Sequence, residues 1–150
     1  MKIIRNSTPR QDGFRMPGEF EPQDQIYMIW PVRGDNWHSG AKPAQWNFVD
    51  VAQAINKFTP VTMCVPSEQY QNAKDMLGES IRVVEISSND SWMRDIGPTF
   101  VVNDKGQRRM VDWDFNAWGG LVDGLYFPWD QDVLVPKKIG EMDGFDSYKT

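Results

Sequence analysis

The sequence is poor in the residues that most often carry reactive chemistry. Among 150 residues it has a single cysteine, Cys64, and a single histidine, His38. An internal disulfide and a zinc site built from Cys and His are therefore excluded within one chain. With one thiol and one imidazole, the chain also offers few candidates for a catalytic nucleophile or base.

Long apolar runs and an excess of positive charge are also missing. No run approaches the roughly 20 apolar residues that span a bilayer. Met1–Asn6 turns polar before a signal-peptide core could form. We therefore expect a cytoplasmic protein without membrane contact. The formal net charge of −5 disfavours nucleic acid as a partner.

The residues that are present suffice for one packed domain. Hydrophobic residues make up 40% and charged residues 25%, close to the average of soluble globular proteins. Seven tryptophans and eight phenylalanines add many bulky packing groups. A chain of this length can bury a core of its own.

The first hundred residues alternate between strand and helix patterns, after an irregular lead-in over 1–25. The alternation predicts an α/β fold whose neighbouring strands are partly parallel. We expect Ser67 to cap the second helix and Gly78 to end it. The predicted elements are, in order, strand 26–30, helix 44–58, strand 61–65, helix 67–77 and strand 81–86.

The remainder predicts a β-hairpin and a loop. Segments 98–102 and 109–115 alternate around the polar turn Asn103–Gly106, which is typical of a hairpin. Asn116–Gly120 reads as a glycine-ended loop where backbone can approach a ligand closely. A further helix is expected in 129–140.

Segment 89–100 places carboxylates beside a tryptophan. A planar guanidinium is held best by carboxylates that accept its in-plane N–H groups, with an indole on its face. Asp90, Asp95 and Trp92 supply those groups. The alternative is that Arg94 pairs with an aspartate at the surface while Trp92 fills the core.

Three segments together resemble the agmatine deiminase family: GFRMPGEF at 13–20, WMRDIGPTF at 92–100 and FNAWGG at 115–120. The resemblance runs over nearly all 150 residues. It implies the pentein fold, an α/β propeller of five pseudo-symmetric ββαβ modules around a central channel. About two of the five modules would lie in this chain.

The resemblance also implies an activity, the hydrolysis of agmatine to N-carbamoylputrescine and ammonia without metal or organic cofactor. A cysteine thiolate attacks the guanidinium carbon and ammonia leaves. Water activated by a histidine then releases the product. Carboxylates hold the cationic substrate, because its lost hydration must be offset by negative partners.

Four residues match functional positions of the family. Asp95 corresponds to the aspartate that binds and orients the guanidinium, and Trp92 to a tryptophan that lines the substrate channel. Asn116 and Trp118 lie in the motif near the pocket and are predicted to contribute to substrate binding. Arg94 is expected to orient Asp95 or to brace the loop.

The family's nucleophile has no counterpart here. It lies near the carboxyl end of the family's enzymes, in a Gly-rich segment ending Asn-Ile-His-Cys. Cys64 lies in a predicted core strand, where cysteine is usually inert packing, and His38 is expected at the surface or rim. We therefore expect 1–150 to be the amino-terminal portion of one catalytic domain, truncated before the catalytic His and Cys and inactive alone.

Two other readings remain open. The chain could be a non-catalytic module that binds guanidines or polyamines, or a module for subunit interaction. The full-length enzyme is expected to form homo-oligomers, as is common in the family. Agmatine is favoured over arginine by the resemblance, whereas site chemistry leaves both open, as it does a biosynthetic or a catabolic role in polyamine metabolism.

Overall fold

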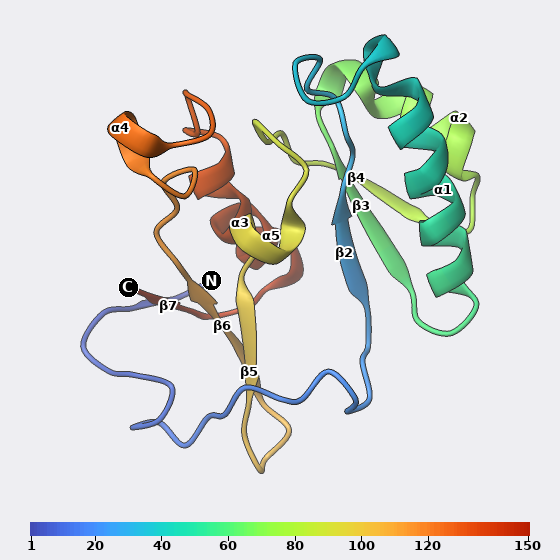
Figure 1. The fold of residues 1–150 in the computed structure, drawn as a ribbon. Helices are drawn as coiled ribbons and strands as arrows, with labels where there is room; N and C mark the ends of the chain where they lie inside the picture. The colour runs from blue at the N-terminus through green and yellow to red at the C-terminus, as the bar shows by residue number, and fades with distance from the viewer. The chain divides into compact units, whose positions relative to one another are not determined.

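The computed structural model describes residues 1–150, which form two compact units (Figure 1). Unit 1 combines Met1–Glu21 with Arg94–Thr150, and unit 2 is the continuous stretch Pro22–Met93. Each unit contains one β-sheet. The mixed α/β character predicted from the sequence is confirmed.

Unit 2 is a three-stranded parallel sheet in the order β2-β3-β4. Each crossover between neighbouring strands contains a helix, as parallel pairing requires. Its elements are β2 (Ile26–Ile29), α1 (Lys42–Asn56) with the 3-10 turn η1 (Ser39–Ala41), β3 (Val61–Val65), α2 (Tyr70–Leu77) with the 3-10 turn η2 (Ser67–Gln69), and β4 (Arg82–Glu85).

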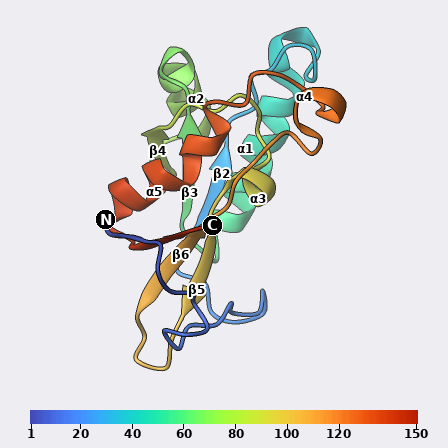
Figure 2. The same ribbon diagram turned by 90° about the vertical axis from the view of Figure 1, so that its left-hand side faces the viewer.

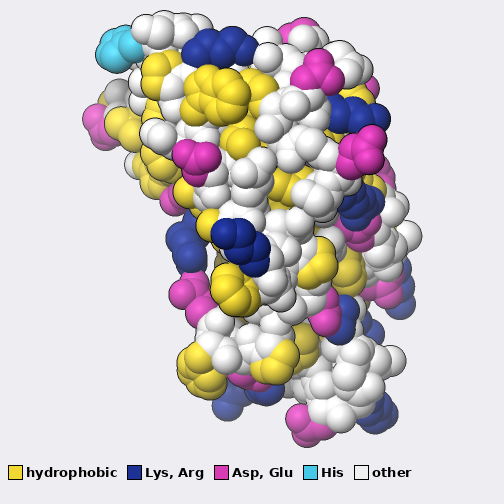
Figure 3. All heavy atoms as spheres, turned by 90° about the vertical axis from the view of Figure 1, so that its right-hand side faces the viewer, with side chains coloured by type: hydrophobic (Ala, Val, Ile, Leu, Met, Phe, Trp, Pro, Cys, Tyr) yellow, Lys and Arg dark blue, Asp and Glu magenta, His cyan; other side chains and the backbone are white.

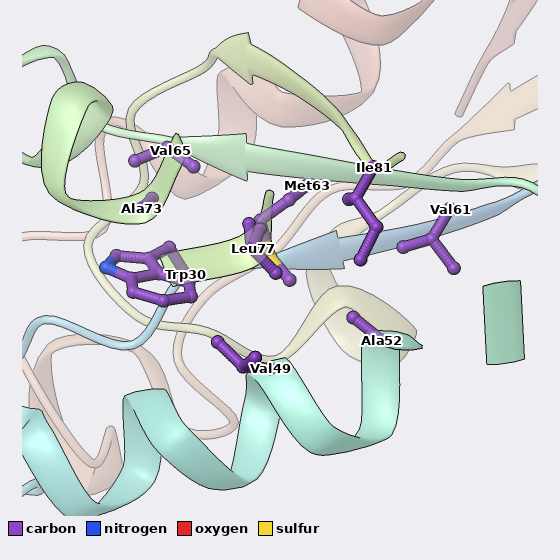
Figure 4. Close-up of a cluster of buried hydrophobic side chains, with 9 residues drawn as sticks. All are labelled: Trp30, Val49, Ala52, Val61, Met63, Val65, Ala73, Leu77 and Ile81. Atoms are coloured by element: carbon purple, nitrogen blue, oxygen red, sulfur yellow. The ribbon is translucent and has the colours of Figure 1, made fainter. Parts of the chain in front are cut away.

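One hydrophobic core joins the sheet of unit 2 to both helices (Figure 4). Alternate residues of β3 face this core, because successive strand side chains point to opposite faces. Val49 and Ala52 reach the core from α1, and Leu77 from α2. The fully or nearly buried members are Trp30, Val49, Ala52, Val61, Met63, Val65, Ala73, Leu77 and Ile81.

The predicted elements of unit 2 are confirmed to within a few residues, but one predicted cap is wrong. Ser67 makes no capping hydrogen bond; the turn η2 begins after Pro66, and the Ser67 hydroxyl donates to Glu68. Gly78 ends α2 with φ of 76°, as expected for a glycine that follows a helix.

Unit 1 contains a mixed four-stranded sheet in the order β1-β7-β6-β5. Its elements are β1 (Ile3–Ile4), α3 (Met93–Ile96, which begins at the last residue of unit 2), β5 (Thr99–Val102), β6 (Arg108–Asp112), α4 (Gly120–Asp123), the 3-10 turn η3 (Asp132–Leu134), α5 (Val135–Asp143) and β7 (Ser147–Lys149). The antiparallel β5–β6 hairpin is confirmed (Figure 2). Its turn is closed by the Gly106 N–H, which donates to the Asn103 carbonyl at 3.0 Å.

The lead-in predicted as irregular is ordered by long-range contacts. Residues Ile3–Ile4 pair in parallel with β7, and Arg15 bridges to Val102 of β5. A two-residue strand carries too little alternation to be recognised from sequence. The helix predicted at 129–140 begins later, with η3 and then α5, whose first turn contains Pro136.

A cluster of polar and aromatic groups fastens the lead-in to the sheet of unit 1. The Asp12 carboxylate accepts hydrogen bonds from Arg109 at 2.6 Å and from the Tyr148 hydroxyl at 2.7 Å. The Arg109 guanidinium lies 4.5 Å from the centre of the Phe14 ring. Hydrogen bonds, first from Ser7 and then from Tyr148, lower the pKa of Asp12.

No helix of the structure combines the length and apolarity needed to cross a bilayer.

Candidate functional site

The predicted site residues fall into two sets, one in each unit. Trp92 belongs to unit 2, and Asp95, Asn116 and Trp118 belong to unit 1. The boundary between the units falls inside the Trp-Met-Arg-Asp motif, after Met93. Each set is described within its own unit.

In unit 2, the buried carboxylate of Asp90 holds the Trp92 side chain by a hydrogen bond. Asp90 is 3% exposed. Its Oδ2 accepts the Trp92 indole N–H at 2.9 Å and Arg33 Nη1 at 2.8 Å, and its Oδ1 accepts the Ser91 backbone N–H at 2.8 Å. Asp90 was expected to offer its carboxylate to the guanidinium of a ligand. This expectation is corrected, because the guanidinium that Asp90 holds is that of Arg33.

Trp92 itself is partly open to solvent. Its side chain is 40% exposed, so the alternative in which it fills the core is wrong. One side of the indole packs against Trp37, with ring centroids 5.9 Å apart and planes tilted by 36°. Trp37 in turn packs edge-to-face on Phe48 of α1 at 6.3 Å. The exposed part of Trp92 is therefore presented on a supported aromatic stack.

In unit 1, Asp95 lies at the surface in α3. Its Oδ1 accepts the Trp118 indole N–H at 3.3 Å. No Lys, Arg or His side chain forms a salt bridge with it in the structure. An exposed carboxylate with one neutral donor retains acceptor positions for a cationic ligand.

Arg94 braces the segment and does not hydrogen-bond to Asp95. Its guanidinium donates to Glu19 at 2.7 Å, and both side chains are largely exposed. This hydrogen bond, with the charge of Glu19, raises the pKa of Arg94. Of the two roles predicted for Arg94, bracing the loop fits this contact and orienting Asp95 through a hydrogen bond does not. The alternative of a surface ion pair between Arg94 and an aspartate is also wrong, because the partner is Glu19.

The loop Asn116–Gly120 has an unusual backbone. Ala117 and Trp118 have φ of 53° and 64°, a region that non-glycine residues rarely adopt. The Leu125 N–H donates to the Ala117 carbonyl at 3.0 Å, and the Gly120 N–H to the Asn116 carbonyl at 2.7 Å. These bonds hold the strained turn that aims the Trp118 indole at Asp95. Strain of this kind is often found at ligand sites.

At Gly119 another part of the chain's own backbone approaches the loop closely. Close approach of a ligand to this loop stays a prediction. A Cβ on Gly119 would lie 2.2 Å from the Asp123 carbonyl carbon. The Asn116 carbonyl accepts the N–H groups of Gly119 and Gly120, so the main chain of Asn116 closes the turn. Substrate contact by the Asn116 side chain stays a prediction.

An aromatic cluster surrounds Trp118. Phe115 packs edge-to-face on its ring at 5.1 Å and Tyr126 at 6.3 Å. The Tyr126 hydroxyl donates to Asp132, which is fully buried. Tyr126 and Asp132 were not singled out from sequence, since nothing in their neighbourhood distinguishes them from other tyrosines and aspartates.

The only cysteine and the only histidine have the environments predicted for them. Cys64 lies in β3 and is 0% exposed, which fits a packing role. His38 is exposed (Figure 3, cyan). No group of three or more His, Cys, Asp or Glu side chains with metal-binding geometry occurs in the structure.

A surface hollow of about 380 Å³ lies elsewhere in unit 2. It contains none of the predicted site residues. It is lined by Tyr70, Lys74, Gly78, Glu79, Ile81, Arg82 and Val83.

Comparison with known proteins places the chain among deiminases. It is 63% identical over 153 residues to a Streptococcus mutans protein named "Putative agmatine deiminase", covering 99% of this chain and 42% of that protein. A solved structure of the agmatine deiminase of Enterococcus faecalis, described as catalysing its reaction, superposes with a TM-score of 0.98 at 60% identity. That match covers 100% of this chain and 41% of the other.

More distant structures show the same fold. The C. jejuni agmatine deiminase superposes with a TM-score of 0.74 at 20% identity, over 92% of this chain and 40% of that one. The chain thus spans about two-fifths of the length of the relatives it matches. These matches confirm the resemblance to agmatine deiminases. Because the family pattern also matches residues 15–150, the chain belongs to the Porphyromonas-type peptidyl-arginine deiminase family.

Proposed function

We propose that this chain supplies the guanidinium-binding part of an agmatine deiminase. The observation that carries the proposal is Asp95, an exposed carboxylate that forms no salt bridge and accepts the Trp118 indole N–H from a strained loop. The chain around it is 60% identical to the Enterococcus faecalis enzyme. Agmatine carries a guanidinium that such a carboxylate can accept through paired N–H groups.

The reaction proposed for the whole enzyme is the hydrolysis of agmatine to N-carbamoylputrescine and ammonia. A cysteine thiolate forms an amidino-cysteine intermediate as ammonia leaves, and a histidine activates the water that resolves it. Neither group is assigned to these 150 residues, because Cys64 is buried and His38 does not match the family base. Asp95 holds the guanidinium carbon in line with the attacking sulfur, and no cofactor is needed.

The architecture proposed for the whole enzyme is the pentein propeller, with about two of its five modules in this chain. Residues 1–150 would be the amino-terminal portion of a single catalytic domain. Unit 1 has the expected ββαβ order in β5, β6, α5 and β7, which supports one module, whereas unit 2 has the order βαβαβ. We propose a cytoplasmic homo-oligomer for the full-length protein, on family resemblance alone.

A chimaera tests the proposal in a full-length context. Residues 1–150 replace the matching stretch of the Enterococcus faecalis agmatine deiminase, and ammonia release from agmatine is measured. We expect an active chimaera whose activity falls by at least about 10²-fold on Asp95→Asn, since the charge that positions the substrate is lost. Asp50→Asn, an exposed aspartate on α1, is the matched control.

Two outcomes would overturn the proposal. One is a folded chimaera that releases no ammonia, with the parent enzyme active in the same assay. The other is an active chimaera indifferent to Asp95→Asn. Circular dichroism and chromatography establish folding in both cases.

The second candidate is a binding module without catalysis. It is favoured by one observation, that the chain's only thiol is 0% exposed while Trp92 and Asp95 are open to solvent. Calorimetry of the 150-residue chain with agmatine separates the two. Binding that Asp95→Asn abolishes, combined with an inactive chimaera, would favour the binding module.

A further inference from the structure

We propose that Asp90 and Arg33 are positioning residues that set the orientation of Trp92 in the substrate site. The catalytic consequence rests on the proposed function above. The geometric claim, that the buried carboxylate aims the indole, concerns unit 2 alone and can be tested without any activity.

The hydrogen bonds of Asp90 already suit this role. Its Oδ2 is shared between the Trp92 indole N–H and the Arg33 guanidinium, at 2.9 and 2.8 Å. With Asp90 only 3% exposed, a substrate guanidinium could reach this oxygen only by displacing Arg33. Asp90 therefore acts on the site through Trp92 and does not touch the substrate.

Two contacts together restrict the Trp92 side chain. The hydrogen bond to Asp90 fixes the Nε1 edge of the indole, and Trp37 supports the ring at 5.9 Å. An indole with only hydrophobic support could rotate about its side-chain torsions. A charged acceptor at Nε1 gives a stronger bond than a neutral one and selects one orientation. The face that remains exposed is then presented in a constant direction.

Stability alone is a poor explanation for the ion pair. Withdrawing a carboxylate and a guanidinium from water is unfavourable, and apolar residues of similar size often stabilise a core equally well. Arg33 is held at its other side by Asp35, which is 69% exposed in its side chain. The arrangement places the negative charge of the Asp90 carboxylate beside one particular atom, the indole nitrogen of Trp92.

Indole NMR tests the geometry directly on the 150-residue chain. Seven tryptophans give seven indole N–H resonances, and Trp92→Phe identifies the one from Trp92. We expect Asp90→Asn to move this resonance and to speed its hydrogen exchange, while the other resonances mostly stay in place. Asp35→Asn makes the same chemical change in the exposed partner of Arg33 and should leave the Trp92 resonance unchanged.

A double-mutant cycle in the chimaera tests the consequence for activity. We expect Asp90→Asn to lower kcat/KM by roughly tenfold to a hundredfold, the effect of a misplaced positioning group. In a Trp92→Phe background the same change should have little further effect, because residues that act through one another are not additive. A purely structural Asp90 would give the same factor in both backgrounds.

The outcomes separate the two proposals. A Trp92 resonance unmoved by Asp90→Asn, or additive losses in the cycle, would overturn the positioning role and leave the proposed function standing. An inactive parent chimaera would remove the proposed function, and the NMR measurement would still decide the geometry. If Asp90→Asn does not fold, Arg33→Gln takes its place in both measurements with the same expectations.

Discussion

In unit 2, Trp92 is held by a carboxylate that is 3% exposed, whereas in unit 1 Asp95 lies at the surface and receives one indole N–H. The surroundings differ as well. Unit 2 has a continuous chain segment and a parallel sheet packed on two helices. Unit 1 joins two distant segments, and its loop 116–120 stores backbone strain.

For the cation-binding role proposed above, the difference separates two tasks. An aromatic surface has to keep a constant orientation, and burial of its anchor in unit 2 provides that. A carboxylate that binds a cation has to retain unused acceptor positions, and exposure of Asp95 provides those. Unit 2 with its stable core is therefore suited to holding Trp92, and unit 1 with its strained loop is suited to presenting Asp95. Both residues belong to the Trp-Met-Arg-Asp motif.

Removing core volume from unit 2 should have the largest effect. Leu77 is 1% exposed, and Leu77→Ala is expected to lower the free energy of unfolding by about 2–5 kcal/mol. Urea unfolding measures the loss, and hydrogen exchange should show it mainly in unit 2. Leu121→Ala, the same change at a residue that is 82% exposed, should stay within about 0.5 kcal/mol. Equal losses in both variants would contradict the assignment of the core.

A methyl group in the strained loop should perturb unit 1. In Gly119→Ala the new Cβ meets the Asp123 backbone at 2.2 Å, so the loop has to move, at about 1–3 kcal/mol or more. The matched Gly120→Ala meets nothing within 4 Å, and only its φ of 65° opposes it, at about 1 kcal/mol. The Trp118 indole resonance should shift strongly only in Gly119→Ala. A larger shift in Gly120→Ala would argue against the described turn.

Strong acid should loosen the lead-in of unit 1. The hydrogen bonds from Arg15 and from the Gly18 N–H lower the pKa of Glu21 to about 2. The folded pKa lies below the unfolded value of about 4.3, so the stabilisation is present at neutral pH. It is lost as pH falls from about 4 to about 2. The Gly18 amide should report this loss by NMR, and Glu21→Gln should remove the pH dependence.

The smallest effect is expected at Ser91, next to Asp90. Its hydroxyl is buried and has no hydrogen-bond partner, so Ser91→Ala removes an unsatisfied group. The free energy of unfolding should change by less than about 0.5 kcal/mol. A loss well above 1 kcal/mol would show that the hydroxyl has a partner after all. Chemical denaturation with purified protein suffices for this measurement.

The local patterns predicted most of the fold. Apolar spacing predicted α1, Gly78 marked the end of α2, and the polar turn at Asn103–Gly106 located the β5–β6 hairpin. The two-residue β1 was missed, since its partner β7 lies at the other end of the chain. Pairing over such separations leaves no local pattern in the sequence.

The site residues named from the sequence stay predictions, and the structure describes only the contacts that they make within the chain. Resemblance predicts substrate contact for Asp95, Trp92, Asn116 and Trp118, whereas the contacts of Asp90 and Arg94 depend on partners far along the chain. Arg33 is 57 positions from Asp90. The positive φ of Trp118 was equally hidden, because a tryptophan gives no sign of a left-handed backbone.

The position of β7 in its sheet bears on the order in which the chain can fold as it leaves the ribosome. Pro22–Met93 is complete early, and its parallel sheet can close while later residues are still being added. The strand β1, although translated before β7, pairs only with β7 and has to wait for Ser147–Lys149. The residues of β1 thus reach their final pairing only after the much later residues of β7 have been made.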